Sequence, residues 1–147
     1  MKRHQSLINL SKDHYHGLVL AQMIKKGAPQ YKGMPGTLKG KLEYTLTFWS
    51  KDLTRHFEEE EKILLPFIIN KNDHLDSLCN KMLQDHKEIK EIIEKLNLDN
   101  NTESLLNDLG FLLERHIRME EREMFETIQN TFSDEELTEL SRKFTEK

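Results

Sequence analysis

Hydrophobic residues recur along the chain at intervals of three and four, the period of an α-helix with one buried face. Four long segments share this period: residues 5–26, residues 38–69, a segment from Asn72 or Asp73 to Leu96, and a segment from Asn100 or Thr102 to Met124. No segment alternates with period two over a useful length. The pattern therefore predicts an all-α fold, an antiparallel up-down-up-down four-helix bundle with short connections.

Turn-forming residues separate these segments. Gly and Pro gather between residues 26 and 37, and residues 97–101 are rich in Asn and Asp, so both stretches are expected to be loops. Pro66 is expected to end or kink the second helix. The capping-box pattern at residues 133–136 predicts a short C-terminal helix over about residues 134–145.

The chain has 147 residues, close to the usual size of one domain. We expect a single domain over residues 1–147, with the bundle over about residues 5–130. Hydrophobic residues make up 36% of the chain and charged residues 33%, which is polar for a globular protein. A core can still form because Leu, Ile, Phe and Met are plentiful and periodically spaced.

Charge and composition exclude several classes of protein. The net charge of −4 gives no basic field that would attract nucleic acid. No apolar run is long enough to span a bilayer, and no secretory signal pattern opens the chain. A single cysteine, Cys79, excludes an internal disulfide and fits a reducing compartment. We therefore expect a cytoplasmic protein that contacts neither nucleic acid nor membrane.

Histidine and carboxylate, the side chains that bind borderline transition metals, are prominent here. The chain has seven histidines beside eighteen glutamates. Each predicted long helix carries one histidine among its inward-facing apolar residues: His14, His56, His86 and His116. The other three histidines, His4, His16 and His74, have no role that the pattern supports.

Two of these histidines begin the same motif. His56 is followed four residues later by Glu60, and His116 by Glu120, and in both cases a second glutamate comes next. Residues four apart share one face of a helix, so each histidine and the first glutamate can reach one point. The other two inward histidines each follow an aspartate. The chain therefore consists of two helix pairs with one plan, Asp-His followed by His-x-x-x-Glu-Glu.

The plan favours a centre of two metal ions. A charged glutamate on an inward face is costly unless it is paired or binds metal. Two ions remove this cost, because each carboxylate can bridge both cations while imidazole nitrogens complete the ligand set. Mixed nitrogen and oxygen ligands suit iron, with manganese or zinc as substitutes. Six side chains around two ions leave open positions where a small molecule can bind.

These residues resemble the hemerythrin-like, or HHE cation-binding, family. The resemblance covers about residues 7–127 and rests on Asp13-His14, His56-Phe-Glu-Glu-Glu60, Asp85-His86 and His116-Ile-Arg-Met-Glu120. It implies a four-helix bundle with two non-haem iron ions joined by an oxo or hydroxo bridge. It also implies the metal ligands: His14, His56, Glu60, His86, His116 and Glu120, the two glutamates being the bridging carboxylates.

The chain departs from the oxygen-carrying members of that family. Those proteins have a His-x-x-x-His pair on the third helix, whereas Lys90 stands four residues after His86 here. They use His-x-x-x-x-Asp on the last helix, whereas Glu120 and Glu121 follow His116 here. The chain is thus closer to the bacterial type with four histidines and two glutamates. Ferritin-like bundles differ further, because their motif is Glu-x-x-His.

The ligand set has rivals. His16 competes with His14, His74 with His86, and Glu121 with Glu120. The remaining acidic residues of the motifs are expected at the surface or behind the ligands: Glu58, Glu59, Glu61, Glu121 and Glu123. Cys79 is expected to be buried filler, with a redox role as the alternative.

We consider three functions for this chain. The leading one is a di-iron protein that binds or senses a small ligand such as oxygen or nitric oxide, or that handles iron. The second is a di-iron redox enzyme acting on peroxide or nitrosative damage, and the third is a metal-free helical interaction protein. A sensor would need a signalling or redox partner protein, and the sequence does not indicate its oligomeric state.

Overall fold

The computed structural model describes residues 2–98 and 101–146, and within these ranges the chain is helical with no β-strand. The α-helices are α1 (Gln5–Met23), α2 (Leu38–Phe48), α3 (Thr54–Glu59), α4 (Leu65–Ile68), α5 (Asp73–Lys95), α6 (Thr102–Met119), α7 (Phe125–Thr131) and α8 (Asp134–Thr145). The expected all-α class is confirmed. Among the described residues, no helix combines the length and the apolar character needed to cross a lipid bilayer.

Several of these helices join end to end through π-helical turns. Trp49–Leu53 and Glu60–Leu64 connect α2, α3 and α4 into one rod, and Glu120–Met124 connects α6 to α7. The amide of Leu65 donates to the Glu60 carbonyl, and the amide of Phe125 donates to the Glu120 carbonyl, each spanning five residues. A π turn adds one residue to a helical turn and is frequent at functional sites. Both turns begin at the glutamate of the repeated motif, and the hydrophobic period gave no sign of them.

Helix ends follow local sequence signals. The Asn72 side chain accepts a hydrogen bond from the Leu75 amide, so α5 begins at Asp73 with Asn72 as its cap. The capping box at the start of α8 is present, as the sequence predicted. Pro66 does not break its rod, because it lies in the first turn of α4, where its missing N–H is tolerated.

Two of the sequence expectations concern the connection before α6. That helix begins at Thr102, one of the two expected starts. The other expected start, Asn100, and the centre of the predicted turn at residues 97–101 lie outside the described residues. The first helix ends at Met23, three residues before its expected end.

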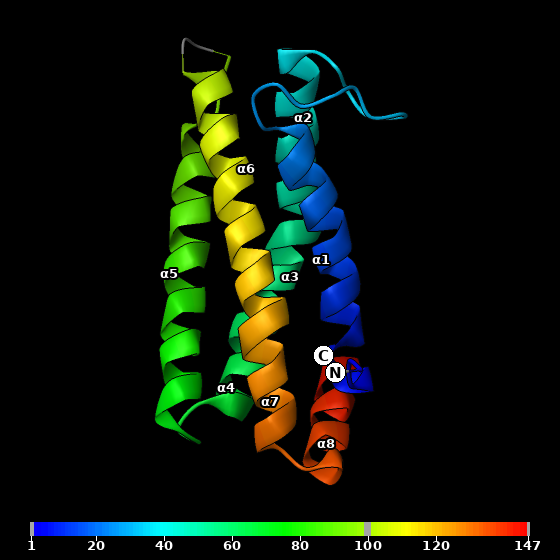
Figure 1. The fold of residues 1–147 in the computed structure, drawn as a ribbon, viewed down its shortest axis with the longest axis vertical. Coiled ribbons are helices and arrows are strands. Elements are labelled where there is room, and N and C mark those ends of the chain that lie inside the picture. The colour runs from blue at the N-terminus through cyan, green and yellow to red at the C-terminus, as the bar shows by residue number, and fades with distance from the viewer. Residues whose placement is uncertain (1, 99–100, 147) are drawn as a thin grey trace.

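The rods lie lengthwise beside one another (Figure 1). Helix α6 contacts α1, α5 and α2, and α8 packs against α1 at the end of the molecule where both termini lie (Figure 1). These contacts make a helical bundle.

The bundle core has two apolar clusters with a polar layer between them. Along α1, Leu7 and Leu10 belong to one cluster and Leu20 to the other, with buried His14 between them. The same order recurs along α5, where His86 lies between Met82 and Ile89. The two clusters therefore enclose a buried layer of histidine and glutamate.

Candidate metal centre

The polar layer contains all six side chains that the sequence singled out. They are buried, none more than 5% exposed: His14, His56, Glu60, His86, His116 and Glu120. Their donor atoms form two overlapping groups, each with donor atoms within 4.8 Å of one another. One group has His14 and His56, the other has His86 and His116, and both share the two glutamates. The structure thus brings the residues together as two neighbouring donor sets with common carboxylates.

The Nε2 atom of each of these four histidines faces the centre. His14 Nε2 lies 2.8 Å from Glu120 Oε1 and 3.2 Å from His56 Nε2. His86 Nε2 lies 3.0 Å from Glu60 Oε1, and His116 Nε2 lies 3.2 Å from Glu120 Oε2. Glu60 Oε2 is 3.4 Å from His56 Nε2. Donor atoms this close can bind a common ion.

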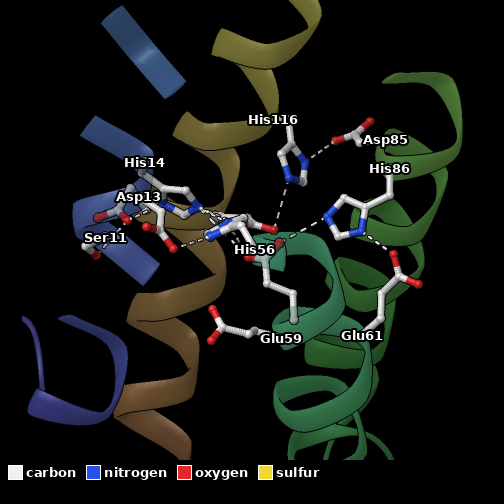
Figure 2. A network of polar contacts seen from close by, with 12 residues as sticks. Ser11, Asp13, His14, His56, Glu59, Glu61, Asp85, His86 and His116 are labelled. Atoms are coloured by element: carbon white, nitrogen blue, oxygen red, sulfur yellow. Dashed lines mark hydrogen bonds and ion pairs between the residues drawn. The ribbon is translucent and has the colours of Figure 1, made fainter. Parts of the chain in front are cut away.

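The Nδ1 atoms of the two motif histidines face outward, each toward an aspartate. His56 Nδ1 lies 3.0 Å from Asp13 Oδ2, and His116 Nδ1 lies 3.0 Å from Asp85 Oδ2 (Figure 2). In each case the aspartate comes from the Asp-His motif of the same helix pair. A carboxylate at Nδ1 fixes the ring tautomer and leaves Nε2 as the ligand atom.

The other two histidines receive their Nδ1 partners from the opposite helix pair. Glu121 Oε2 lies 2.6 Å from His14 Nδ1. Glu61 Oε2 lies 2.7 Å from His86 Nδ1 (Figure 2). These are the second glutamates of the two Glu-Glu doublets. All four imidazoles therefore have a carboxylate behind them, two from within a pair and two from across the bundle.

Further side chains hold these carboxylates. Arg55 bonds Asp13 at 3.1 Å, and Lys81 lies 3.1 Å from Asp85. Glu121 accepts from the Ser11 hydroxyl at 2.7 Å and pairs with Arg3 at 3.1 Å. These contacts hold the carboxylates that lie behind the histidines.

Charge inside the centre shifts several pKa values. Burial lowers the pKa of His56 and His116, but Glu60, Glu120 and the outer aspartates outweigh it and raise both values to about 10. Burial raises the pKa of Glu120, yet the neighbouring histidines hold that pKa well below its ordinary value. In the metal-free centre these shifts favour the imidazolium form of His56 and His116 and the carboxylate form of Glu120.

The buried polar atoms also fit a metal. Within the described part of the chain, Glu60 Oε2, both Glu120 oxygens and His116 Nε2 are buried without a well-directed hydrogen bond. Buried polar atoms are nearly always satisfied, so such atoms on three convergent side chains require a partner. Imidazole nitrogen and carboxylate oxygen are ligands that iron, manganese and zinc share.

The rival residues lie elsewhere. His16 and His74 are exposed, and the donor groups contain His14 and His86 instead. Glu121 lies behind His14, so Glu120 takes the central position. Lys90 is exposed on α5 and offers no fifth imidazole.

Two other residues have structural contacts. His4 caps α1, since its Nδ1 accepts from the Ser6 amide at 3.0 Å. Cys79 is buried in the apolar cluster around Leu75 and Met82, as expected of filler.

Glu61 and Glu121 were expected only at the surface or behind the ligands, and no contact was predicted for Asp13 or Asp85. The repetition indicated that these residues have matching roles, although it did not indicate which histidine each one contacts. Asp13 and Asp85 occupy equal positions in the two halves, and so do the two second glutamates. Residues that support the same centre from two similar helix pairs are expected at equal positions in the two halves of the sequence.

The chain was also compared with known proteins. The comparisons with curated proteins and with solved structures gave no match. The family model of the hemerythrin HHE cation binding domain matches residues 4–128. This match spans most of the chain and includes all six residues of the centre. The chain therefore belongs to the hemerythrin HHE cation-binding family.

Proposed function

We propose that the chain binds two non-haem iron ions in the polar layer. The ligands would be the six buried side chains: His14, His56, Glu60, His86, His116 and Glu120. The observation that carries this proposal is the pair of overlapping donor groups that share both glutamates. Shared carboxylates can bridge two ions, and an oxo or hydroxo bridge between the ions completes the proposal. Manganese or zinc could occupy the same ligands.

The surrounding residues suit such a centre. Outer carboxylates hold the four imidazoles in one tautomer, so that each Nε2 presents a lone pair to the ion. Two bridging glutamates and two cations lessen each other's cost of burial, because the charges compensate at short range. The apolar clusters on both sides limit access of water.

We further propose that this centre binds or senses a small ligand, such as oxygen or nitric oxide, or serves in iron handling. Bound iron would supply open coordination positions and a change of oxidation state. The alternative is a redox enzyme that acts on peroxide or nitrosative damage through the same centre. Either role calls for a redox or signalling partner protein. A metal-free interaction protein is disfavoured by the unsatisfied buried atoms of the centre.

Three broader proposals accompany this function. The helices follow an up-down-up-down order, which the contacts of α6 with α1 and α5 support. Residues 1–147 form a single domain, which the continuous polar layer between two apolar clusters supports. The protein acts in the cytoplasm, a reducing compartment in which a lone buried cysteine such as Cys79 stays reduced.

Metal analysis combined with absorption spectroscopy tests the proposed function. Aerobically purified protein should contain about two irons per chain and have charge-transfer bands of a bridged ferric pair. If iron stays absent even after anaerobic reconstitution with ferrous salt, the proposal fails. Stopped-flow mixing with oxygen, nitric oxide or peroxide then separates reversible binding from turnover.

A further inference from the structure

A cavity of about 250 Å³ lies beside the centre, between α1 and the rod formed by α2, α3 and α4. Its inner end is formed by His14, His56 and His116, while Glu60 and Glu120 do not line it. The space is therefore adjacent to the donor groups. Its outer part reaches Met34, from the connection between α1 and α2.

The wall is partly apolar and partly polar, with Asp13 among its polar residues. Gly17 of α1, Leu113 of α6, and Phe48 and Leu53 of the rod that begins with α2 contribute to it. The residues His16 and Asp52 are exposed and belong to the same lining, so they mark where the cavity meets solvent. An anion would face the carboxylates of Asp13 and Asp52, and Asp13 is already paired with Arg55 and His56, so this lining favours a small uncharged molecule.

The two halves of the repeated plan differ at the residue beside the cavity. Gly17 stands three residues after His14, and Ile89 stands three residues after His86. Ile89 is fully buried, and Phe57 stacks on the His86 ring at a centroid distance of 3.7 Å. The second half thus has a buried isoleucine side chain at the position where the first half has a glycine.

Gly17 also lies close to Ile117 of α6, on another wall of the cavity. A Cβ atom added at Gly17 would come within 2.8 Å of Ile117 Cδ1, which is too close without movement. Ile117 lines the cavity as well, so a side chain at position 17 would push Ile117 into the space. The width of the passage therefore depends on this glycine and isoleucine pair.

We infer that a small uncharged molecule reaches the centre through this passage, and that Gly17 and Ile117 determine what size of molecule can enter. This inference rests on the proposed function, because it assigns a route to the ligand of the same centre. It concerns only residues of this chain, and it can be tested without measuring any reaction at the metal.

Xenon is a suitable probe because it is neutral, and apolar cavities of about 150 Å³ bind it. The full chain, loaded with zinc and labelled with ¹³C at the methionine methyl groups, is titrated with xenon and followed by NMR. The Met34 methyl signal should shift, while the Met82 signal, from the opposite apolar cluster, should not. An unshifted Met34 signal overturns the inference.

Three variants test the size control. Gly17→Ala should lower xenon affinity by a factor of about five or more, since a single methyl group in a tight apolar pocket has an effect of this order. Ile117→Val removes the Cδ1 atom that the introduced methyl group would meet, so combining the two substitutions should return the affinity toward that of the unaltered protein. Ile128→Val, which loses the same atom in the other cluster, is the matched control and should change nothing. Affinity that is equal in Gly17→Ala and the unaltered chain contradicts the inference.

The iron-loaded variants separate this inference from the proposed function. Nitric oxide should associate more slowly with Gly17→Ala than with the unaltered protein, at equal iron content and melting temperature. Xenon entry without iron binding would sink the proposed function and leave the passage intact. Iron binding without xenon entry would sink the passage alone.

Discussion

Replacement of Asp85 tests whether the carboxylates behind the histidines support metal binding. Asp85 is fully buried, and its Oδ2 atom lies 3.0 Å from His116 Nδ1. Its Oδ1 atom pairs with Lys81 at 3.1 Å, and burial is outweighed by these partners, so the pKa of Asp85 is lowered. In Asp85→Asn the shape is kept and the charge is lost. Lys81 is half exposed and can turn to water, so the variant should fold.

The expected loss of metal affinity depends on whether the side chain at position 85 can still accept a hydrogen bond from His116. Loss of an outer partner of a metal-binding histidine typically lowers metal affinity by about 10- to 100-fold. The asparagine oxygen can still accept a hydrogen bond from His116 Nδ1, so Asp85→Asn should lower metal affinity about tenfold, or by ~1.4 kcal/mol. Asp85→Ala leaves no acceptor for His116 Nδ1 and should lower metal affinity about 100-fold, or by ~2.8 kcal/mol.

Competition with a chelator of known affinity measures this difference, with iron content determined in parallel. Asp108→Asn is the matched control, because Asp108 lies on α6, the helix of His116, and outside the centre. The order of affinity should be unaltered protein and Asp108→Asn, then Asp85→Asn, then Asp85→Ala. If a folded Asp85→Ala variant binds iron as tightly as the unaltered protein, the assigned role of the outer carboxylates is wrong.

Three further predictions follow from the same structure. His56→Ala should lower iron content and melting temperature together, because metal binding stabilises the folded state, and unchanged values of both would count against the ligand set. In the metal-free protein the pKa values of His56 and His116 are raised from 6.5 to about 10, so the stability that they contribute is complete below pH 6.5 and is lost as pH rises through 10. Thermal unfolding with a chelator should follow this loss, and a melting temperature that rises from pH 7 to 10 would refute it. Burial raises the pKa of Cys79 to about 11, so a thiol reagent at pH 8 should label it only after unfolding in urea, and fast labelling of the native chain would contradict its burial.

Periodicity predicted the helices well because each of them buries one face. Asn72 and the box at Ser133 marked helix starts where side chains satisfy free amides. The π turns at Glu60 and Glu120 escaped prediction, because a single added residue hardly disturbs a hydrophobic stripe. The effect of Pro66 was also misjudged, since the preceding π turn places it at the start of a helical segment.

The four residues of the His-x-x-x-Glu motifs could be predicted because helical geometry places residues i and i+4 on one face. His14 and His86 could be predicted because they lie among the inward-facing apolar residues of their helices. The carboxylates behind them could not be assigned in the same way. Glu61 and Glu121 reach histidines of the opposite helix pair, and such a contact depends on how the pairs are arranged in space. Sequence spacing within one helix contains no information on that arrangement.

This arrangement ties the two halves of the chain together through the centre. Each of the two central glutamates belongs to both donor groups, and each second glutamate crosses to the other pair, as Glu61 does to His86. The two aspartates, by contrast, act within their own pairs, as Asp13 does on His56. Binding of metal would therefore stabilise contacts between the pairs in addition to those within each pair. The near symmetry ends at Gly17 and Ile89, where a glycine that lines a cavity corresponds to a fully buried isoleucine. The two donor groups therefore share one ligand plan but differ in the side chains that pack beside them.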